Sequence, residues 1–436
     1  MKSRTLFLLV AVLVTFGPQA AALGGAAQPS PANLTLDRAV QIAISNSPEM
    51  HAAQERVNEA RMYAQVQKFG YYPYLSFNGI GKLGLSGATN GLGLLGLPAS
   101  PFFRNLADAF NVNQNIFDFG RTSHSVKVAN AEVSVAEHAL EEVRIRTAEQ
   151  TAEAFLELLS LQRAIQVKEQ DLKERQSVER RAQEFFEVGL SSKLDLDLAE
   201  VGTSSAELAL TQAHADEQAA WSKLLAALGQ PQGGNYQLVE PSIKLEVPAT
   251  VDSETEQAIA NRPDLVRMQA EIEAQQERLE YAQSLRRPSL RAVFSGGYAR
   301  FADPTAANQA AGGLGLFAPI YTGGSLKAEV RAEQSKLEAL RSEYSFRELQ
   351  VRTQVSQAHA KVIKTLSSAQ ANEKIASYAE EALRLARTRY NAQLISMVEL
   401  LTAETTAESA RAAYAQALYD YEIARARLSS TMGLQP

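Results

Sequence analysis

The stretch FFEVGLSSKLD at residues 185–195 marks the point where one long helix ends and another begins. Gly189 suits the left-handed backbone conformation that commonly follows the last residue of a helix. Ser192 and Asp195 have the spacing of a capping box, in which each side chain satisfies a free backbone N–H group of the other residue. The stretch therefore predicts a tight helical hairpin.

A second copy of this hairpin lies near the end of the chain, where residues 389–399 read RYNAQLISMVE. Its serine and carboxylate are Ser396 and Glu399, 204 residues after the first copy. Upstream, AISNSPEM at 43–50 returns as AIANRPDL at 258–265, at an offset of 215 residues. Two constant offsets indicate an internal duplication, since self-similarity at a fixed period marks a structural unit that is used more than once.

The duplication divides the chain into segments. We expect a first structural repeat over 23–229, a linker or equatorial segment over 230–253 and a second repeat over 254–436. The step between the offsets, from 215 to 204, makes the first repeat longer by 11 residues. The extra residues fall in the Gly/Leu-rich stretch 79–101, which we predict to be a surface loop because such loops absorb insertions.

The N-terminus has the pattern of an export signal. Lys2 and Arg4 precede an apolar run over 6–16, and Ala20 and Ala22 form a small-x-small cleavage site. We predict a signal peptide over 1–22. The alternative is a membrane anchor, but the apolar run is shorter than the roughly 20 residues of a membrane-spanning helix. No later segment has the pattern of such a helix.

Very long helices are predicted after residues 120 and 324. The segments 121–187 and 325–391 extend roughly 100 Å at 1.5 Å per residue, and the returning segments 192–228 and 396–432 roughly 55 Å. Helices in globular proteins average about 11–12 residues, so these do not belong to a compact domain. They predict a coiled-coil or tube-like assembly, because a helix of this kind is stable only when its apolar face is packed.

Strand pairs are predicted before each long helix, over about 71–81 and 108–118, and over about 288–298 and 312–321. Apolar Phe110, Val112 and Ile116 alternate with polar Asn111, Asn113 and Asn115. Strands of 9–11 residues with one apolar and one polar face fit a membrane barrel with lipid outside and water inside. A half-buried hairpin in a soluble protein explains the alternation equally well.

Composition excludes several classes of protein. The chain has no cysteine, so it has neither disulfides nor a thiolate metal site, and its net charge of -6 argues against a nucleic-acid partner. Its five histidines lack the spacing of metal ligands. Because no nucleophile–base pair and no phosphate-binding loop occurs, we predict that it is not an enzyme and has no cofactor.

If the predicted strands lie in a membrane, they require more than one chain. Four strands cannot close a barrel, since single-chain bacterial barrels start at eight strands. An open sheet edge in lipid leaves backbone groups unsatisfied at several kcal/mol each. The pattern therefore predicts an oligomer without fixing its number.

The duplication, the strand pairs before Gly120 and Gly324, and the two hairpin turns together resemble the TolC-like outer-membrane efflux family, over essentially the whole mature chain. The resemblance implies a mainly α fold with a small transmembrane β part, in duplicated halves that each consist of a helix, a strand pair, a very long helix and a long helix. It implies a homotrimer with a shared twelve-strand β-barrel in the lipid of the outer membrane and an α-barrel tunnel across the periplasm. A periplasmic adaptor (a membrane fusion protein) and an inner-membrane pump are the implied partners.

The resemblance also implies roles for residues near the hairpin turns. A periplasmic gate is expected at Asp195, Tyr390, Glu399 and Thr402. In the family's best-known member, a tyrosine and an arginine near the second tip bond to an acid near the first tip and form a latch that closes the entrance. Tyr390 and Asp195 match the tyrosine and the acid, but Ile395 stands at the position of the arginine. Glu399 matches the first of two constriction carboxylates, and Thr402 stands at the position of the second. Because of these two differences, the gate roles known in the family transfer only in part to this chain. The implied adaptor contacts are Val188, Gly189, Leu190, Ser191, Ala392, Gln393, Leu394 and Ile395.

Alternatives remain at this stage. Asp195 and Glu399 can serve as helix caps, as gate residues or as both. Within the channel interpretation the cargo is small molecules or drugs, with protein secretion of type I and metal efflux as alternatives. An interpretation of another class is an exported coiled-coil structural protein, which explains the signal and the helices but not four alternating strands.

Overall fold

The computed structural model describes residues 32–85, 102–230, 233–234, 236–300 and 307–436. The predicted signal peptide lies outside these residues, as does most of the predicted Gly/Leu-rich loop. The structure is 76% helical with small sheets, which confirms the predicted mainly α fold class.

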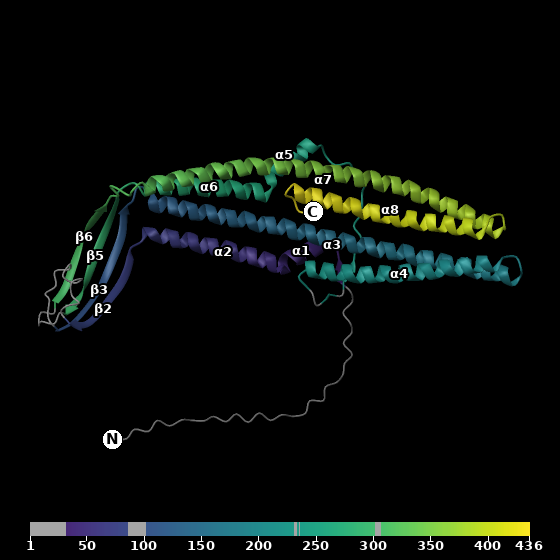
Figure 1. Cartoon of the computed structure of the whole chain (residues 1–436), viewed down its shortest axis with the longest axis horizontal. Helices are drawn as coiled ribbons and strands as arrows, with labels where there is room; N and C mark the ends of the chain where they lie inside the picture. The colour runs from purple at the N-terminus through teal and green to yellow at the C-terminus, as the bar shows by residue number, and fades with distance from the viewer. Residues whose placement is uncertain (1–31, 86–101, 231–232, 235, 301–306) are drawn as a thin grey trace, which may run out of the picture.

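The molecule is an elongated layer of helices with a sheet at one end (Figure 1). Two 67-residue helices, α3 (Arg121–Glu187) and α7 (Ser325–Asn391), lead from the sheet to the far end. The 35-residue helices α4 (Lys193–Ala227) and α8 (Met397–Thr431) return from there. At 1.5 Å per residue the long helices extend about 100 Å, the length that the sequence predicted.

Shorter helices complete the half of the layer that is nearer the sheet. α2 (Pro48–Lys68) packs against α3, and α6 (Pro263–Ser284) packs between α3 and α7. Each begins with proline at its first position, where no intrahelical partner for an N–H group is lost. α1 (Leu36–Asn46) and α5 (Val251–Asn261) precede them. In the far half, α8 takes the place of α6 between α3 and α7.

Four antiparallel strands form the sheet in the order β2-β3-β5-β6. They are β2 (Tyr74–Leu85), β3 (Phe102–Phe117), β5 (Ser289–Arg300) and β6 (Ala307–Phe317). The register places Leu75 opposite Val112, and Val112 opposite Phe294. The predicted apolar alternation therefore forms one continuous face across the strands.

The strand bounds differ from the prediction. Residues Phe69–Tyr71 form a 3-10 turn, and β2 starts only at Tyr74, directly after Pro73, which has no N–H group to donate. β6 ends at Phe317, two residues before Pro319, so the predicted extension to 321 is wrong. β3 begins at Phe102, earlier than the predicted 108. Strand ends carry the weakest sequence signal because alternation says nothing about where pairing stops.

Two short strands that the sequence analysis did not predict lie near the middle of the helical layer. β1 (Ala32–Leu34) pairs in parallel with β4 (Tyr236–Leu238), which falls inside the predicted linker. The chain after β4 crosses the layer and is held by two tyrosines of α8. The Tyr419 hydroxyl donates to Glu240 Oε1 (2.6 Å), and the Tyr421 hydroxyl donates to the Glu246 carbonyl (2.9 Å).

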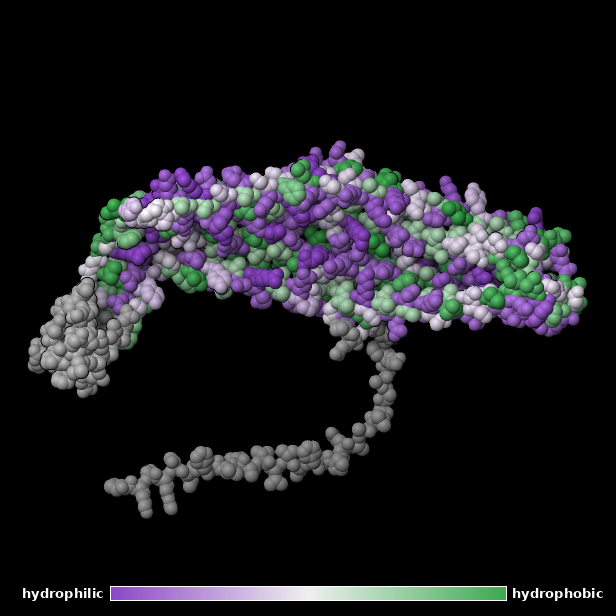
Figure 2. All heavy atoms as spheres, viewed as in Figure 1, coloured by the Kyte–Doolittle hydropathy of each residue, from purple (hydrophilic) through white to green (hydrophobic). Residues whose placement is uncertain are grey.

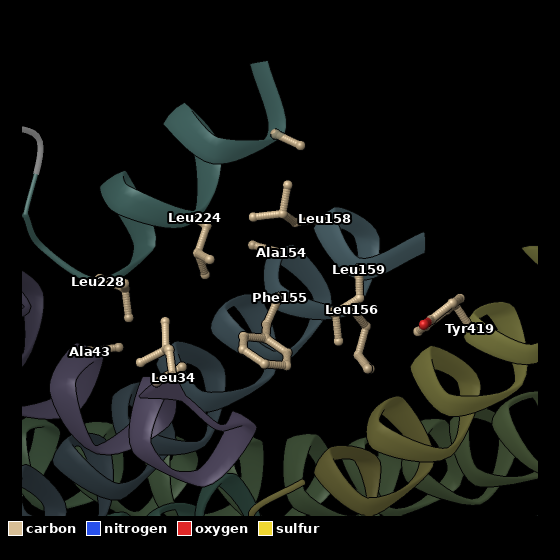
Figure 3. Close-up of a cluster of buried hydrophobic side chains, with 12 residues drawn as sticks. Leu34, Ala43, Ala154, Phe155, Leu156, Leu158, Leu159, Leu224, Leu228 and Tyr419 are labelled. Carbon is tan, nitrogen blue, oxygen red and sulfur yellow. The ribbon is translucent and has the colours of Figure 1, made fainter. Parts of the chain in front are cut away.

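A large cluster of buried side chains lies where α1, α3, α4 and α8 meet (Figure 3). Phe155 and Leu158 of α3 face Leu224 of α4 and Leu34 of β1, and each of these side chains is at most 1% exposed. Burying one such side chain stabilises the fold by about 1.5–3 kcal/mol. Elsewhere along the helices alanine dominates the buried positions, which allows close packing of long helices.

Candidate functional site

The first hairpin tip, residues 188–192 between α3 and α4, is a helix-ending turn of the Schellman type. Gly189 has φ 75°. The Leu190 N–H donates to the Phe185 carbonyl (2.8 Å), and the Gly189 N–H donates to the Phe186 carbonyl (3.0 Å). These two bonds satisfy carbonyl groups that the end of α3 would otherwise leave free.

The second tip, residues 392–396 between α7 and α8, has the same geometry without glycine. Gln393 takes the left-handed conformation with φ 58°. The Leu394 N–H donates to the Arg389 carbonyl (2.9 Å), and the Gln393 N–H to the Tyr390 carbonyl (2.8 Å). The turn forms although its central residue carries a side chain in a conformation that costs roughly 1–2 kcal/mol.

Both predicted capping boxes are present. Asp195 Oδ2 accepts from the Ser192 N–H (3.1 Å), and the Asp195 N–H donates to Ser192 Oγ (3.2 Å). Glu399 Oε2 accepts from the Ser396 N–H (2.8 Å), and the Glu399 N–H donates to Ser396 Oγ (3.3 Å). These carboxylates therefore cap α4 and α8.

Hydrogen bonding favours the ionised form of both caps. Burial opposes ionisation of Asp195, but the hydrogen bonds from Ser192 and Ser191 lower the pKa of its carboxyl group. The backbone and hydroxyl hydrogen bonds of Ser396 lower the pKa of Glu399, which is exposed. Both carboxyl groups are negatively charged at neutral pH.

Tyr390 lies in the apolar contact between the two hairpins. It is 7% exposed, and its ring centroid lies 6.1 Å from that of Phe185. Burial, and then the charge of Asp195, raise the pKa of Tyr390. Within the described residues no hydrogen bond joins Tyr390 to Asp195. The structure brings the two residues near each other without forming the latch that the resemblance suggested.

The remaining predicted site residues lie at the tips or just beyond them. Val188, Leu190 and Leu394 are exposed to between 60% and 75%. Ala392 and Gln393 are exposed, while Ile395 packs partly against the apolar cluster beneath the tip. Ser191 donates to Asp195 Oδ2 (3.1 Å), and the exposed Thr402 donates back to the Val398 carbonyl (2.7 Å).

Figure 2 shows hydrophobic surface at the two ends of the molecule and mostly hydrophilic surface between them. At the tips this surface includes Val188, Leu194 and Leu394, whose side chains are at least 66% exposed. Apolar side chains that gather in an exposed patch, as they do at the tips, mark an interaction site.

Above the tips, polar contacts join the two hairpins. The Arg181 guanidinium of α3 donates to the Asn391 side-chain oxygen of α7. Beside this contact lies a cavity of about 320 Å³ between α3 and α7, with Leu400 of α8 in its wall. Lys173 and Arg387 also line it. The hairpins are therefore bridged within one chain.

Farther from the tips, seven charged residues form what we call the inter-hairpin cluster. Its members are Asp171, Glu174 and Arg175 of α3, Glu380 and Arg387 of α7, and Glu404 and Arg411 of α8. Sequence analysis did not identify this cluster. The pairs that join the two hairpins, Glu174 with Arg387 and Glu174 with Arg411, are more than 200 positions apart and leave no local signal.

One member of the cluster did leave a signal that could have been used. Leu400, Glu404 and Ala407 follow one another at spacings of four and three, which is the buried stripe of α8. A carboxylate in an apolar stripe departs from the pattern, because acidic residues are almost never fully buried without a partner.

Nothing in the described part of the chain resembles a reaction centre. No group of three or more histidine, aspartate or glutamate side chains there is arranged to hold a metal ion. None of the described helices is both long enough and apolar enough to cross a membrane. What the far end offers is a pair of adjacent hairpins with apolar tips, charged caps and polar cross-links, an arrangement suited to binding and movement.

The sequence profile of the outer membrane efflux protein family matches residues 39–230 and 255–434. The two matched segments correspond to the two repeats and omit most of the segment between them. Outer membrane efflux protein BepC of Brucella suis biovar 1 is 23% identical over 339 residues, which covers 77% of this chain and 74% of BepC.

Solved structures show the same fold. The outer-membrane channel OprN superposes with a TM-score of 0.79 at 17% identity, covering 92% of this chain and 91% of that one. The outer membrane protein VceC of Vibrio cholerae superposes with a TM-score of 0.76 at 19% identity, covering 91% and 96%.

Proposed function

This chain belongs to the outer membrane efflux protein family, and we propose that it is the exit duct of a tripartite efflux pump for small molecules. Members of this family are outer-membrane channels and not enzymes. In our proposal three copies form a passive conduit that reaches into the periplasm, where an adaptor protein opens it at the hairpin tips. The observation that carries the proposal is the separation of a four-stranded sheet from two helical tips by helices about 100 Å long.

The sheet supports assembly with further copies. β2 and β6 are its outer strands, and each has one edge without a partner in the described part of the chain. An edge of this kind is not tolerated in lipid, because its backbone groups would stay unsatisfied. Pairing β2 of one copy with β6 of the next removes every edge. Three copies then give a barrel of twelve strands, an even number within the range of bacterial barrels.

Aromatic side chains indicate how far the sheet would extend into the membrane. A group of exposed aromatic residues surrounds the junction between helices and sheet: Phe69, Tyr71, Tyr72, Tyr74, Phe117, Phe119, Phe317 and Tyr321. Aromatic rings of this kind collect at the boundary between lipid and water. The junction would therefore lie at the periplasmic face of the outer membrane.

The two long edges of the helical layer support a closed ring. α4 lies at one edge and α7 at the other (Figure 1). Val201 and Leu208 of α4 are 62% and 60% exposed, and Tyr378 and Leu385 of α7 are 76% and 44% exposed. Counted from the ends of their helices at the tips, Val201 and Leu385 lie about 12 and 9 Å away, and Leu208 and Tyr378 about 22 and 20 Å. The exposed apolar residues of the two edges therefore lie at similar distances from the tips, which favours packing of α4 of one copy against α7 of the next. A head-to-tail contact of this kind generates a ring.

The gate is proposed at the tips. Asp195 and Glu399 start α4 and α8, so their charges lie at the end that the adaptor would approach. If Glu399 faces the symmetry axis, three carboxylates converge there and favour cations. Glu399→Gln is then expected to reduce cation preference in planar-bilayer recordings, and unchanged preference would remove Glu399 from the pore.

The adaptor would bind the exposed tip residues Val188, Leu190 and Leu394, together with the backbone of Gly189. Gly189 has nothing within 4 Å of the position that a Cβ atom would occupy, so a partner has room to approach the turn. Cargo selection is assigned to the pump, and small molecules are the proposed class. Protein secretion and metal efflux use ducts of the same kind.

The absence of cysteine makes a direct test of the ring possible. We would introduce Val201→Cys and Leu385→Cys and treat outer membranes with a short bismaleimide. The proposal predicts covalent trimers, and Val201→Cys with Leu349→Cys is the control because Leu349 lies far from that level on α7. Monomers only, in membranes that contain folded protein, would contradict the ring.

A further inference from the structure

Glu404 is the one acid of the inter-hairpin cluster that has no ion-pair partner of its own. It lies on α8 and is 2% exposed. The other three acids each have one: Asp171 accepts from Arg175 Nε (2.8 Å), and Glu174 from Arg387 Nη2 (2.6 Å). Glu380 accepts from Arg411 Nη2 (2.7 Å). Four acids thus face three arginines.

The hydrogen bonding of Glu404 is correspondingly poor. Its Oε1 accepts from Arg387 Nη2 at 3.3 Å, a long bond from a group that Glu174 holds at 2.6 Å. Its Oε2 is buried and has no hydrogen-bond partner among the residues that the structure describes. A buried carboxylate with an unsatisfied oxygen is costly, whereas a protonated carboxyl group carries no charge to solvate. Protonation would also make the cluster electrically neutral.

The position of Glu404 ties this protonation to the two hairpins. The side chain lies on the stripe with which α8 packs into its neighbours, and the cluster around it joins α3 of the first hairpin to α7 and α8 of the second. Separation of the hairpins would expose the carboxyl group to water, where the ionised form is favoured.

We infer that Glu404 is a proton-binding site, which takes up a proton when the two hairpins pack together and releases it when they part. The inference rests on the proposed function, in which the hairpins separate when the duct opens. Packing is then favoured at low pH, and rising pH favours opening. A single site changes the equilibrium by at most tenfold per pH unit.

The charges around Glu404 agree with this direction. Burial raises the pKa of Glu404, and Arg387 and Arg175 offset this only in part. Asp171 of α3 raises it further. A pKa that is raised in the packed state stabilises that state below the pKa of the solvated group and loses this contribution as pH rises through the raised value.

Other charged groups near the site are already paired. From α3, Glu174 bonds to Arg387, and Lys168 pairs with Glu408 of α8 at 3.6 Å. Arg411 of α8 is shared between Glu380 and Glu174. From α4, the uncharged Gly202 faces Arg175. Only Arg387 and Arg175 therefore offset the burial of Glu404, and each of these two arginines is also paired with another acid.

Infrared spectroscopy of the purified full-length protein tests the proton directly. Wild-type protein in its resting state should show the C=O stretch of a buried protonated carboxyl group at the acid end of a pH titration, and the band should fade as pH rises through the raised pKa of Glu404. Glu404→Gln should lack the band, and Glu408→Gln, one turn further along α8, should retain it. Identical spectra for wild-type protein and Glu404→Gln would overturn the inference, whether or not the protein conducts.

Planar-bilayer recordings then test the coupling. For wild-type protein the open probability should rise by up to tenfold per pH unit over the pH range in which the infrared band fades. Glu404→Gln, which mimics the protonated form, should show the low open probability of wild-type protein at acid pH throughout. A full wild-type pH response in Glu404→Gln would overturn the coupling and leave the channel function intact. Absence of conductance in every variant would instead contradict the proposed function.

Discussion

The two hairpin tips have the same backbone but different residues at its most constrained position. Gly189 and Gln393 both take the left-handed conformation, at φ 75° and φ 58°, and the flanking hydrogen bonds match. Each tip is followed by a serine cap and an acid that returns the hydrogen bond. The comparison teaches that the caps and the helix-ending bonds specify the turn, whereas glycine only lowers its cost.

The hairpins differ more in how they are held to each other. Arg387 of α7 bonds to Glu174 and Glu404, while the equivalent residue of α3, Gln183, is exposed and bonds only to Glu187 one turn away. This cross-link therefore depends on an arginine that the duplication did not preserve, although its partner Glu404 has an equivalent acid, Glu200, in the first repeat. The features that both halves share build the tips, and residues that only one half has, such as Arg387, join them.

Arg387→Ala should have the largest effect. It leaves the buried Glu404 without a partner and removes one from Glu174, so we expect a loss of about 2–3 kcal/mol, below the value for a fully buried pair because Arg387 is partly exposed. Thermal unfolding in detergent measures it. Gln183→Ala is the matched control and should stay within about 0.5 kcal/mol of wild-type protein. Equal losses for both would show that the cross-links are not where we place them.

Exchanging residues at the two turns should have opposite effects. Gly189→Ala should cost about 1 kcal/mol through backbone strain alone, because a Cβ atom there meets nothing within 4 Å. Gln393→Gly should relieve that strain and gain about 0.5 kcal/mol after the added flexibility of the unfolded chain is subtracted. The same thermal assay measures both, and changes of the same sign would break the comparison.

Removing the caps should affect both hairpins alike. Ser192→Ala and Ser396→Ala each remove the acceptor for the third N–H group of a helix, and each should cost about 1 kcal/mol. Hydrogen exchange of the first turn of α4 and of α8 resolves the two sites. Fraying at only one site would show that the two caps contribute unequally.

Acid should weaken both caps together, with the smallest effect. Hydrogen bonds lower the pKa of Asp195 and of Glu399 in the folded protein. Their stabilising contribution is present above the ordinary carboxyl pKa of about 4 and is lost as pH falls below it. The melting temperature of an Asp195→Asn, Glu399→Gln variant should therefore fall less on acidification than that of wild-type protein.

Sequence reasoning succeeded where a signal is local. The helices at 121–187 and 325–391 and both capping boxes follow from spacing within one turn or from unbroken periodicity. The left-handed Gln393 is the exception among the turns, because the hydrogen bonds around it outweigh its own conformational preference. The alternation predicted the strands but not where they end. Pro73 precedes the start of β2, and Pro319 follows the end of β6.

The candidate site could be predicted only in part. Family resemblance led to Tyr390 and Asp195, and the structure places them close together without a hydrogen bond between them. The inter-hairpin cluster was missed because Glu174 and Arg411 meet only after the two repeats pack against each other. The burial of Glu404 was readable from its place in the stripe of α8, but its partners were not.

The central claim is a duct shared by three chains, and the mass of the purified complex tests it most directly. The mature protein, extracted from outer membranes in detergent, should carry bound detergent and have a protein mass of three chains by light scattering. A detergent-free soluble species with the mass of one chain would contradict the shared duct.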